Sequence, residues 1–117
     1  MSSSVFDPTA VAASFIALSD QTPAPAGGVA SRTLLQSRGG KSMVFSFDAG
    51  QELSEHTNPN HAILSGLTGS VEVTAGEAVH TLGPGDLLHL PPKIPHAVKA
   101  ENAASFLLQL IAPQPSS

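Results

Sequence analysis

The chain has 117 residues, of which 41% are hydrophobic and only 12% are charged, and its formal net charge is −4. A chain of this length forms one domain with a real core, and a charged share about half the usual ~25% argues against a disordered body. Its five Lys and Arg residues offer no basic patch for nucleic acid or an anionic membrane, and the absence of Cys excludes disulfides and leaves only nitrogen and oxygen ligands for a metal.

Residues 1–28 are expected to form one short helix and a linker outside the main body. Asp7 suits the N-cap and Pro8 the first helical position. Apolar residues then recur at spacings of four and three between Val11 and Leu18. This stretch is too short to cross a bilayer, and the start of the chain lacks the positive charge of a secretory signal. We therefore expect a cytoplasmic protein with no membrane partner.

From residue 29 onward the pattern predicts short strands separated by Gly, Pro and Asn. Met43, Phe45 and Phe47 alternate with smaller residues, which is the period of a half-buried strand. Evenly spaced short strands are typical of an antiparallel sandwich or barrel, so the fold class is all-β. The nine predicted strands are Val29–Gln36, Lys41–Asp48, Glu52–His56, Ala62–Leu67, Ser70–Thr74, Ala78–Leu82, Leu87–Leu90, His96–Ala100 and Ser105–Ile111.

The stretch from Gly83 to His96 combines a turn, a strand and a stiff corner. Gly83-Pro84-Gly85-Asp86 predicts a type II turn, with proline at its second position and glycine at its third. Three prolines between residues 91 and 95 cannot donate to a ladder and predict an edge or a corner. His96 is therefore held just past a restricted segment of backbone.

The same stretch carries the first of two motifs that resemble those of the cupin superfamily. Gly85, Pro91 and His96, with five and then four residues between them, match the second cupin motif as far as its histidine. The asparagine that ends this motif falls at Ala100.

The first cupin motif has a glycine, a His-x-His pair, a glutamate and a second glycine at fixed spacings. Laid on this chain, those positions hold Gly50, His56, Asn58, Ala62 and Gly69. Both glycines and the first histidine match, whereas the second histidine and the glutamate are replaced.

The resemblance covers roughly Val29 to Ile111. It implies that residues 29–112 form a single-domain cupin jelly-roll β-barrel, with the motif histidines converging inside its mouth. Residues 113–117 are then a loose tail.

The resemblance also implies a divalent metal ion, Fe, Mn, Ni or Zn, held by His56 and His96. Such an ion in a catalytic site usually has at least three protein ligands. Asn58, His61 and His89 are the candidates for a further ligand, and Asn58 would supply only a neutral carbonyl oxygen.

Each histidine also has a role without metal. His56 and His96 can be hydrogen-bonded pocket residues. His61 lies next to the position of the lost glutamate, where strand parity turns it outward unless a bulge or a loop reverses it. His89 lies on the strand before the second motif, and the sequence does not fix which way it points. His80 is expected to be a solvent-exposed strand residue.

On the strand that ends at His56, period two places Glu52 and Ser54 on the face of the histidine. Glu52 would then hydrogen-bond the imidazole and fix its tautomer. The alternative is a carboxylate that faces solvent.

The implied pocket is mostly apolar, which is the usual form of a site for a small organic ligand or substrate. Gly66 is expected to leave room for that ligand. The predicted lining residues are Met43, Phe45, Phe47, Ala62, Leu64, Gly66, Val98, Phe106 and Leu108.

Three functions remain open from the sequence, and it does not decide whether the protein is an enzyme. The first is a small metal-binding cupin acting on an organic molecule in the barrel mouth. The second is a non-catalytic cupin that binds or senses a small ligand without metal, and the third is a structural dimer. The low charge and the additional N-terminal segment also predict a homodimer.

Overall fold

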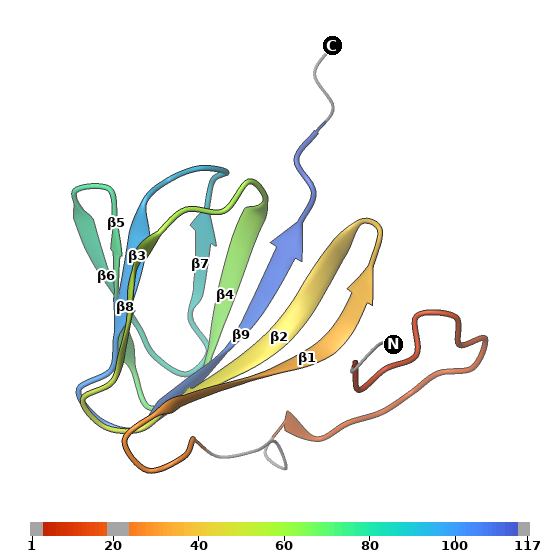
Figure 1. The fold of residues 1–117 in the computed structure, drawn as a ribbon, viewed down its shortest axis with the longest axis horizontal. Coiled ribbons are helices and arrows are strands. Elements are labelled where there is room, and N and C mark those ends of the chain that lie inside the picture. Colours follow the sequence, from red (N-terminus) through yellow and green to blue (C-terminus); the bar gives the residue numbers. More distant parts are fainter. Residues whose placement is uncertain (1–3, 19–23, 115–117) are drawn as a thin grey trace.

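The computed structural model describes residues 4–18 and 24–114, and within them the chain forms nine β-strands in two sheets (Figure 1). One sheet has the order β1-β2-β9-β4-β7 and the other has the order β3-β8-β5-β6. All of the pairings are antiparallel. The strands are β1 (Val29–Ser37), β2 (Gly40–Phe47), β3 (Glu52–His56), β4 (His61–Thr68), β5 (Val71–Ala75), β6 (Ala78–Leu82), β7 (Leu87–Leu90), β8 (His96–Lys99) and β9 (Ala104–Ile111).

The all-β prediction is confirmed, and each predicted strand has a counterpart with nearly the same bounds. Strand order interleaves distant parts of the chain, because β9 lies between β2 and β4 while β8 lies between β3 and β5. Figure 1 shows the two sheets facing each other, with the β1–β2 hairpin farthest from the four-stranded sheet.

The core lies between the sheets and follows the period of two. In β5 the residues alternate between buried and exposed, with Val73 completely buried. Phe106 in β9 stacks on Phe47 and Phe45 of β2, with ring centroids 5.7 and 5.4 Å apart. Burying Phe47 and Phe106, which are 1% and 2% exposed, stabilises the fold by about 1.5–3 kcal/mol each.

The predicted type II turn at Gly83 is present between β6 and β7. The N–H of Asp86 donates to the Gly83 carbonyl over 3.0 Å, and Gly85 has a φ of 85°. The Asp86 carboxylate also accepts the N–H of Gly83 at 2.9 Å, which closes the turn from its other side. A positive φ at this position explains the need for glycine.

The predicted N-terminal helix is wrong for the described residues of that segment, 4–18, which form turns and irregular backbone. The Asp7 carboxylate does accept the N–H of Thr9 at 2.9 Å, as an N-cap would, but the chain leaves the turn after Ala10. A short helix needs packing of its apolar face to be stable. Val11 and Phe15, on the predicted apolar face, are 104% and 92% exposed, so that packing is missing.

The beginning of this segment is instead attached to the edge of the five-stranded sheet. Val5 and Phe6 donate their N–H groups to the carbonyls of Thr33 and Leu34 in β1, over 3.1 and 2.7 Å. Parts of the predicted helix, linker and tail, at residues 19–23 and 115–117, lie outside the described residues. Within the described ranges, none of the chain forms a helix long and apolar enough to span a bilayer.

Candidate functional site

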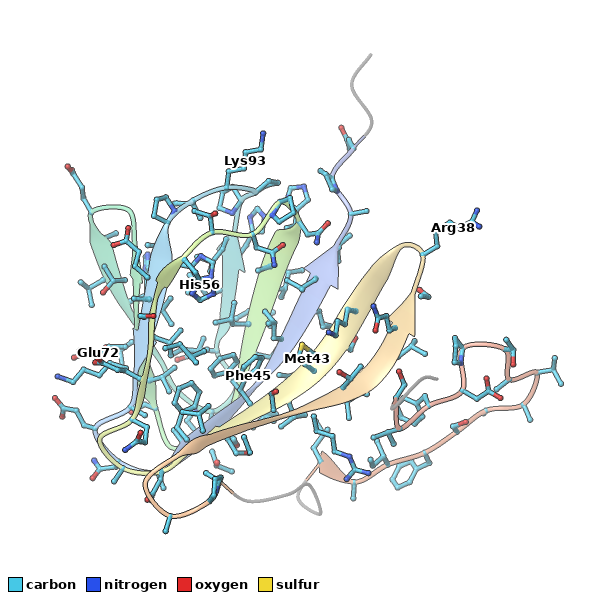
Figure 2. All side chains as sticks on the ribbon, viewed as in Figure 1. Arg38, Met43, Phe45, His56, Glu72 and Lys93 are labelled. Carbon is cyan, nitrogen blue, oxygen red and sulfur yellow. The ribbon has the colours of Figure 1, made fainter. Side chains whose placement is uncertain are left out.

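The two motif histidines form a directly paired couple on neighbouring strands. His56 is the last residue of β3, His96 is the first residue of β8, and the two are cross-strand partners. Their ring centroids lie 4.2 Å apart with an angle of 63° between the planes. Figure 2 shows the His56 side chain on the side of β3 that faces the five-stranded sheet. Two imidazoles that are 40 residues apart in the sequence are thus neighbours in the fold.

Each ring is fixed by a carbonyl two residues earlier in its own strand or corner. Nδ1 of His56 lies 2.8 Å from the Ser54 carbonyl oxygen, and Nδ1 of His96 lies 3.0 Å from that of Ile94. Because a carbonyl oxygen only accepts, Nδ1 carries the proton in both rings. In the neutral form, Nε2 of each histidine therefore keeps a free lone pair.

The two histidines differ in exposure. His96 is only 9% exposed and is the buried polar residue at the edge of the core, whereas His56 is exposed. Val98, two residues after His96, is 3% exposed and belongs to the core. The imidazole of His96 is thus packed at the edge of the core, and that of His56 is exposed to solvent.

A β-bulge in β3 turns His56 toward the core. Glu52 pairs with Lys99 and Leu53 with Val98, but the register then shifts before His56 pairs with His96. The shift reverses the parity on which the prediction for Glu52 depended. Glu52 is exposed on the other face, which agrees with the solvent-facing alternative, and the Ser54 carbonyl contacts the imidazole instead.

The corner before His96 contains an unusual backbone conformation. Lys93 has a φ of 71°, a left-handed value that residues other than Gly rarely adopt. It follows Pro92 in a turn that the N–H of Ile94 closes on the Pro91 carbonyl at 3.4 Å. This turn aims the Ile94 carbonyl at the His96 ring. This turn could not be predicted from the residues, because type II turns normally place Gly or Asn at this position.

Backbone hydrogen bonds join this corner to the neighbouring loops. The N–H of Lys93 donates to the Asn58 carbonyl at 2.7 Å, which connects the loops beside the two motif histidines. The N–H of Gly76, between β5 and β6, donates to the Pro95 carbonyl at 2.9 Å. The histidine pair is therefore held by loops that are fastened to each other.

The predicted further ligands are not gathered around His56 and His96. Oδ1 of Asn58 accepts the N–H of Asn60 at 2.8 Å, so the oxygen predicted as a ligand caps its own loop. His61 and His89 instead contact each other, with 2.9 Å between Nδ1 of His61 and Nε2 of His89. Among the residues that the structure describes, no three His, Asp or Glu side chains are grouped to hold a metal.

The predicted pocket residues divide into a solid core and a more open part. Met43, Phe45 and Leu108 are only partly buried, and they line neighbouring positions of β2 and β9. Met43 pairs with Leu108, whereas Phe45 pairs with Phe106, the partner of Gly66, and so lies nearer the end that carries the Gly83–Asp86 turn. The other predicted apolar side chains are at most 3% exposed and belong to the core: Phe47, Ala62, Leu64, Val98 and Phe106.

Gly66 does not make room for a ligand, which corrects the prediction. A Cβ atom at Gly66 would overlap the carbonyl oxygen of Gly83. The space is therefore filled by the backbone of the turn between β6 and β7. His80, on the edge strand β6, is exposed as expected.

Comparisons with known proteins agree with this fold. The family model described as the cupin domain matches residues 43–109. A conserved protein of unknown function from Streptococcus pyogenes is 31% identical, with a TM-score of 0.79 over 89% of this chain and 91% of that one. A cupin superfamily protein from Desulfitobacterium hafniense is 25% identical, with a TM-score of 0.78 over 82% and 88% of the two chains.

An RmlC-like cupin protein from Desulfovibrio desulfuricans shares the fold at 24% identity, with a TM-score of 0.77 over 88% of this chain and all of that one. Among curated proteins, none matches this chain.

Proposed function

This chain belongs to the cupin family, and we propose that it binds a small organic molecule beside a divalent metal ion held by His56 and His96. The observation that carries the proposal is the bond from each Nδ1 to a backbone carbonyl. Each bond fixes its ring and leaves the lone pair of Nε2 available to bind a metal ion. This is the arrangement that orients histidine ligands in metal sites.

The donor set restricts the metal. Two neutral imidazoles suit Fe, Ni or Zn, whereas Mn prefers oxygen ligands. With two protein ligands, most coordination positions are left for water and for oxygen or nitrogen atoms of the bound molecule. When bound, the ion would polarise such a molecule as a Lewis acid.

The residues of the chain determine what that molecule can be. Met43, Phe45 and Leu108 supply an apolar, half-buried surface on the facing sheet. Such surfaces exclude water from one side of a ligand, and a few polar groups then orient it. A small molecule with one apolar side and one metal-binding side fits these walls.

Metal analysis tests the proposal. The protein, expressed with Fe, Ni and Zn supplied, is expected to carry one ion for each His56–His96 pair. Substituting His56→Ala or His96→Ala should remove it, whereas His80→Gln, an exposed histidine on an edge strand, should not. Protein that lacks this ion under metal-replete expression would contradict the metal site.

The second candidate is a small-ligand-binding cupin that uses the same walls without metal. The two-histidine donor set, smaller than that of a usual catalytic site, supports it. A compound that raises the melting temperature of metal-free protein, and loses that effect in Phe45→Ala, would favour this candidate. Stabilisation by a ligand follows directly from binding to the folded state.

We also infer a homodimer, for which the support is exposed apolar surface. Val11 and Phe15 in the N-terminal segment are almost fully exposed, and Leu87 and Ile111 on the five-stranded sheet are 73% and 46% exposed. Exposed apolar side chains mark an interface where they form one contiguous patch, which is the arrangement that the dimer requires of these residues. Light scattering at micromolar concentration should give twice the mass of the chain, and the monomer mass would refute the dimer. A cytoplasmic location stays a prediction from the sequence.

A further inference from the structure

A second pair of histidines lies on the outer face of the five-stranded sheet. His61 in β4 alternates with Ala62, and His89 in β7 alternates with Leu90; Ala62 and Leu90 are 3% and 2% exposed in the core. Because successive side chains of a strand point to opposite faces, His61 and His89 lie on the face away from the core. His89 is paired with Ile63, two residues after His61, so the two histidines are diagonal neighbours.

The two rings are hydrogen-bonded to each other rather than to the backbone. Nδ1 of His61 and Nε2 of His89 are 2.9 Å apart, and the ring centroids are 5.1 Å apart with the planes 28° from parallel. One of the two nitrogens donates its proton and the other accepts with its lone pair. The ring that donates can move its proton to its other nitrogen, which is a change of tautomer and releases no proton. Nδ1 of His61 and Nε2 of His89 then both have a lone pair that can bind a metal ion.

The distance between these nitrogens matches one coordination geometry better than another. Two imidazole nitrogens about 2.0–2.1 Å from a tetrahedral zinc ion are separated by about 3.3 Å. In adjacent positions of a square-planar or octahedral ion, the right angle reduces that separation to about 2.8–3.0 Å. The observed 2.9 Å corresponds to the right angle, which Cu²⁺ and Ni²⁺ prefer. The rings must still turn so that both lone pairs meet at the ion, and the outer torsion of histidine is soft enough to allow this.

This pair is independent of the first. His96 adjoins the core from the four-stranded sheet, and His56 pairs with it directly. His56 and His96 are separated from the face that carries His61 and His89 by the core side chains and by the backbone of the five-stranded sheet. An ion bound by one pair is therefore not shared with the other.

We propose that His61 and His89 form a second metal site, which binds a Ni²⁺ or Cu²⁺ ion through Nδ1 of His61 and Nε2 of His89, with water in the remaining positions. Such an ion bridges β4 to β7, and β7 is the four-residue edge strand of the sheet. Metal binding at this position stabilises the attachment of that edge. The site does not depend on whether His56 and His96 bind metal.

Titration of the His56→Gln/His96→Gln protein with Ni²⁺ tests the proposal, because it removes the first pair from the measurement. Calorimetry should detect one Ni²⁺ ion per chain, and Zn²⁺ should bind at least tenfold more weakly. An additional His61→Gln or His89→Gln substitution should abolish the Ni²⁺ signal, and an additional His80→Gln should leave it unchanged. The proposal would be overturned if the His56→Gln/His96→Gln protein did not bind Ni²⁺, or if Ni²⁺ binding survived the additional His61→Gln substitution.

A second measurement uses the unsubstituted chain. With Cu²⁺ added in steps, the electron paramagnetic resonance spectrum should show a species coupled to imidazole nitrogen that disappears in His61→Gln and in His89→Gln. If these substitutions leave all nitrogen-coupled copper in place, the site does not exist. Both residues are at the surface, so circular dichroism should confirm that the variants keep the fold.

Discussion

The two ends of the barrel are built in different ways. At the end that carries the turn Gly83–Asp86, backbone packs on backbone, since Gly66 donates to the Asp86 carbonyl at 2.9 Å and accepts from Gly85 at 3.0 Å. At the histidine end the loops are fastened by fewer bonds and one imidazole is exposed to water. In Figure 1 these ends are separated by the length of the strands.

This difference separates stability from function. Backbone contacts at the closed end leave no space for a ligand, so substitutions there should act on folding. The histidine end has an imidazole exposed to solvent, so substitutions there should cost less stability than those at the closed end and can also change binding. Four substitutions test the comparison.

Gly66→Ala at the closed end should have the largest effect. Its Cβ atom would overlap the Gly83 carbonyl oxygen, and both atoms belong to rigid parts of the chain. We expect a loss of about 3 kcal/mol or more in the free energy of unfolding, measured with denaturant. Gly83→Ala is the matched control, because its nearest contact would be the Asp86 side chain at an ordinary 3.5 Å. Equal effects of both substitutions would show that the closed end is not tightly packed.

His96→Ala should be the most destabilising change at the histidine end. It removes a side chain that is 9% exposed and leaves the Ile94 carbonyl without its donor. We expect a loss of about 1–3 kcal/mol. His56→Ala at the exposed member of the pair should change stability by less than about 0.5 kcal/mol. Equal losses would mean that the two histidines are equally buried in solution.

Local spacing predicted the turn Gly83–Asp86, because a type II turn needs glycine where φ is positive, at Gly85. Spacing alone did not predict that His56 and His96 lie together. That expectation came from the resemblance to the two cupin motifs, and the two residues are cross-strand partners in the structure.

Features that depend on tertiary packing were not predictable in this way. One register shift after Leu53 moved Glu52 to the wrong face for its predicted role. The N-terminal segment has the apolar spacing of a helix, but Val11 and Phe15 are not packed against any of the residues that the structure describes. The contact between His61 and His89 depends on the pairing of β4 with β7, which the spacing of the two residues does not specify.

Asn58→Ala should have a moderate effect. It removes the side-chain acceptor for the N–H of Asn60 and leaves the backbone bond from Lys93 in place. A loss of about 0.5–1.5 kcal/mol is expected in denaturant unfolding. Asn58→Asp keeps an acceptor oxygen at the same place and should retain the stability. If Asn58→Ala instead left stability unchanged and removed bound metal, its oxygen would be a ligand rather than a loop cap.

Lys93→Gly should have the smallest effect and the opposite sign. Lys93 is exposed and holds a φ of 71°, which glycine adopts without steric cost. Relief of this strain outweighs the added freedom of glycine in the unfolded chain, so we expect a gain of about 0.5–1 kcal/mol. Lys99→Gly, at the end of β8 with ordinary strand geometry, should lose a similar amount. Thermal unfolding of both variants decides the sign. A loss in Lys93→Gly would show that the Lys93 side chain, rather than only its N–H bond to Asn58, holds the loops of the histidine end together.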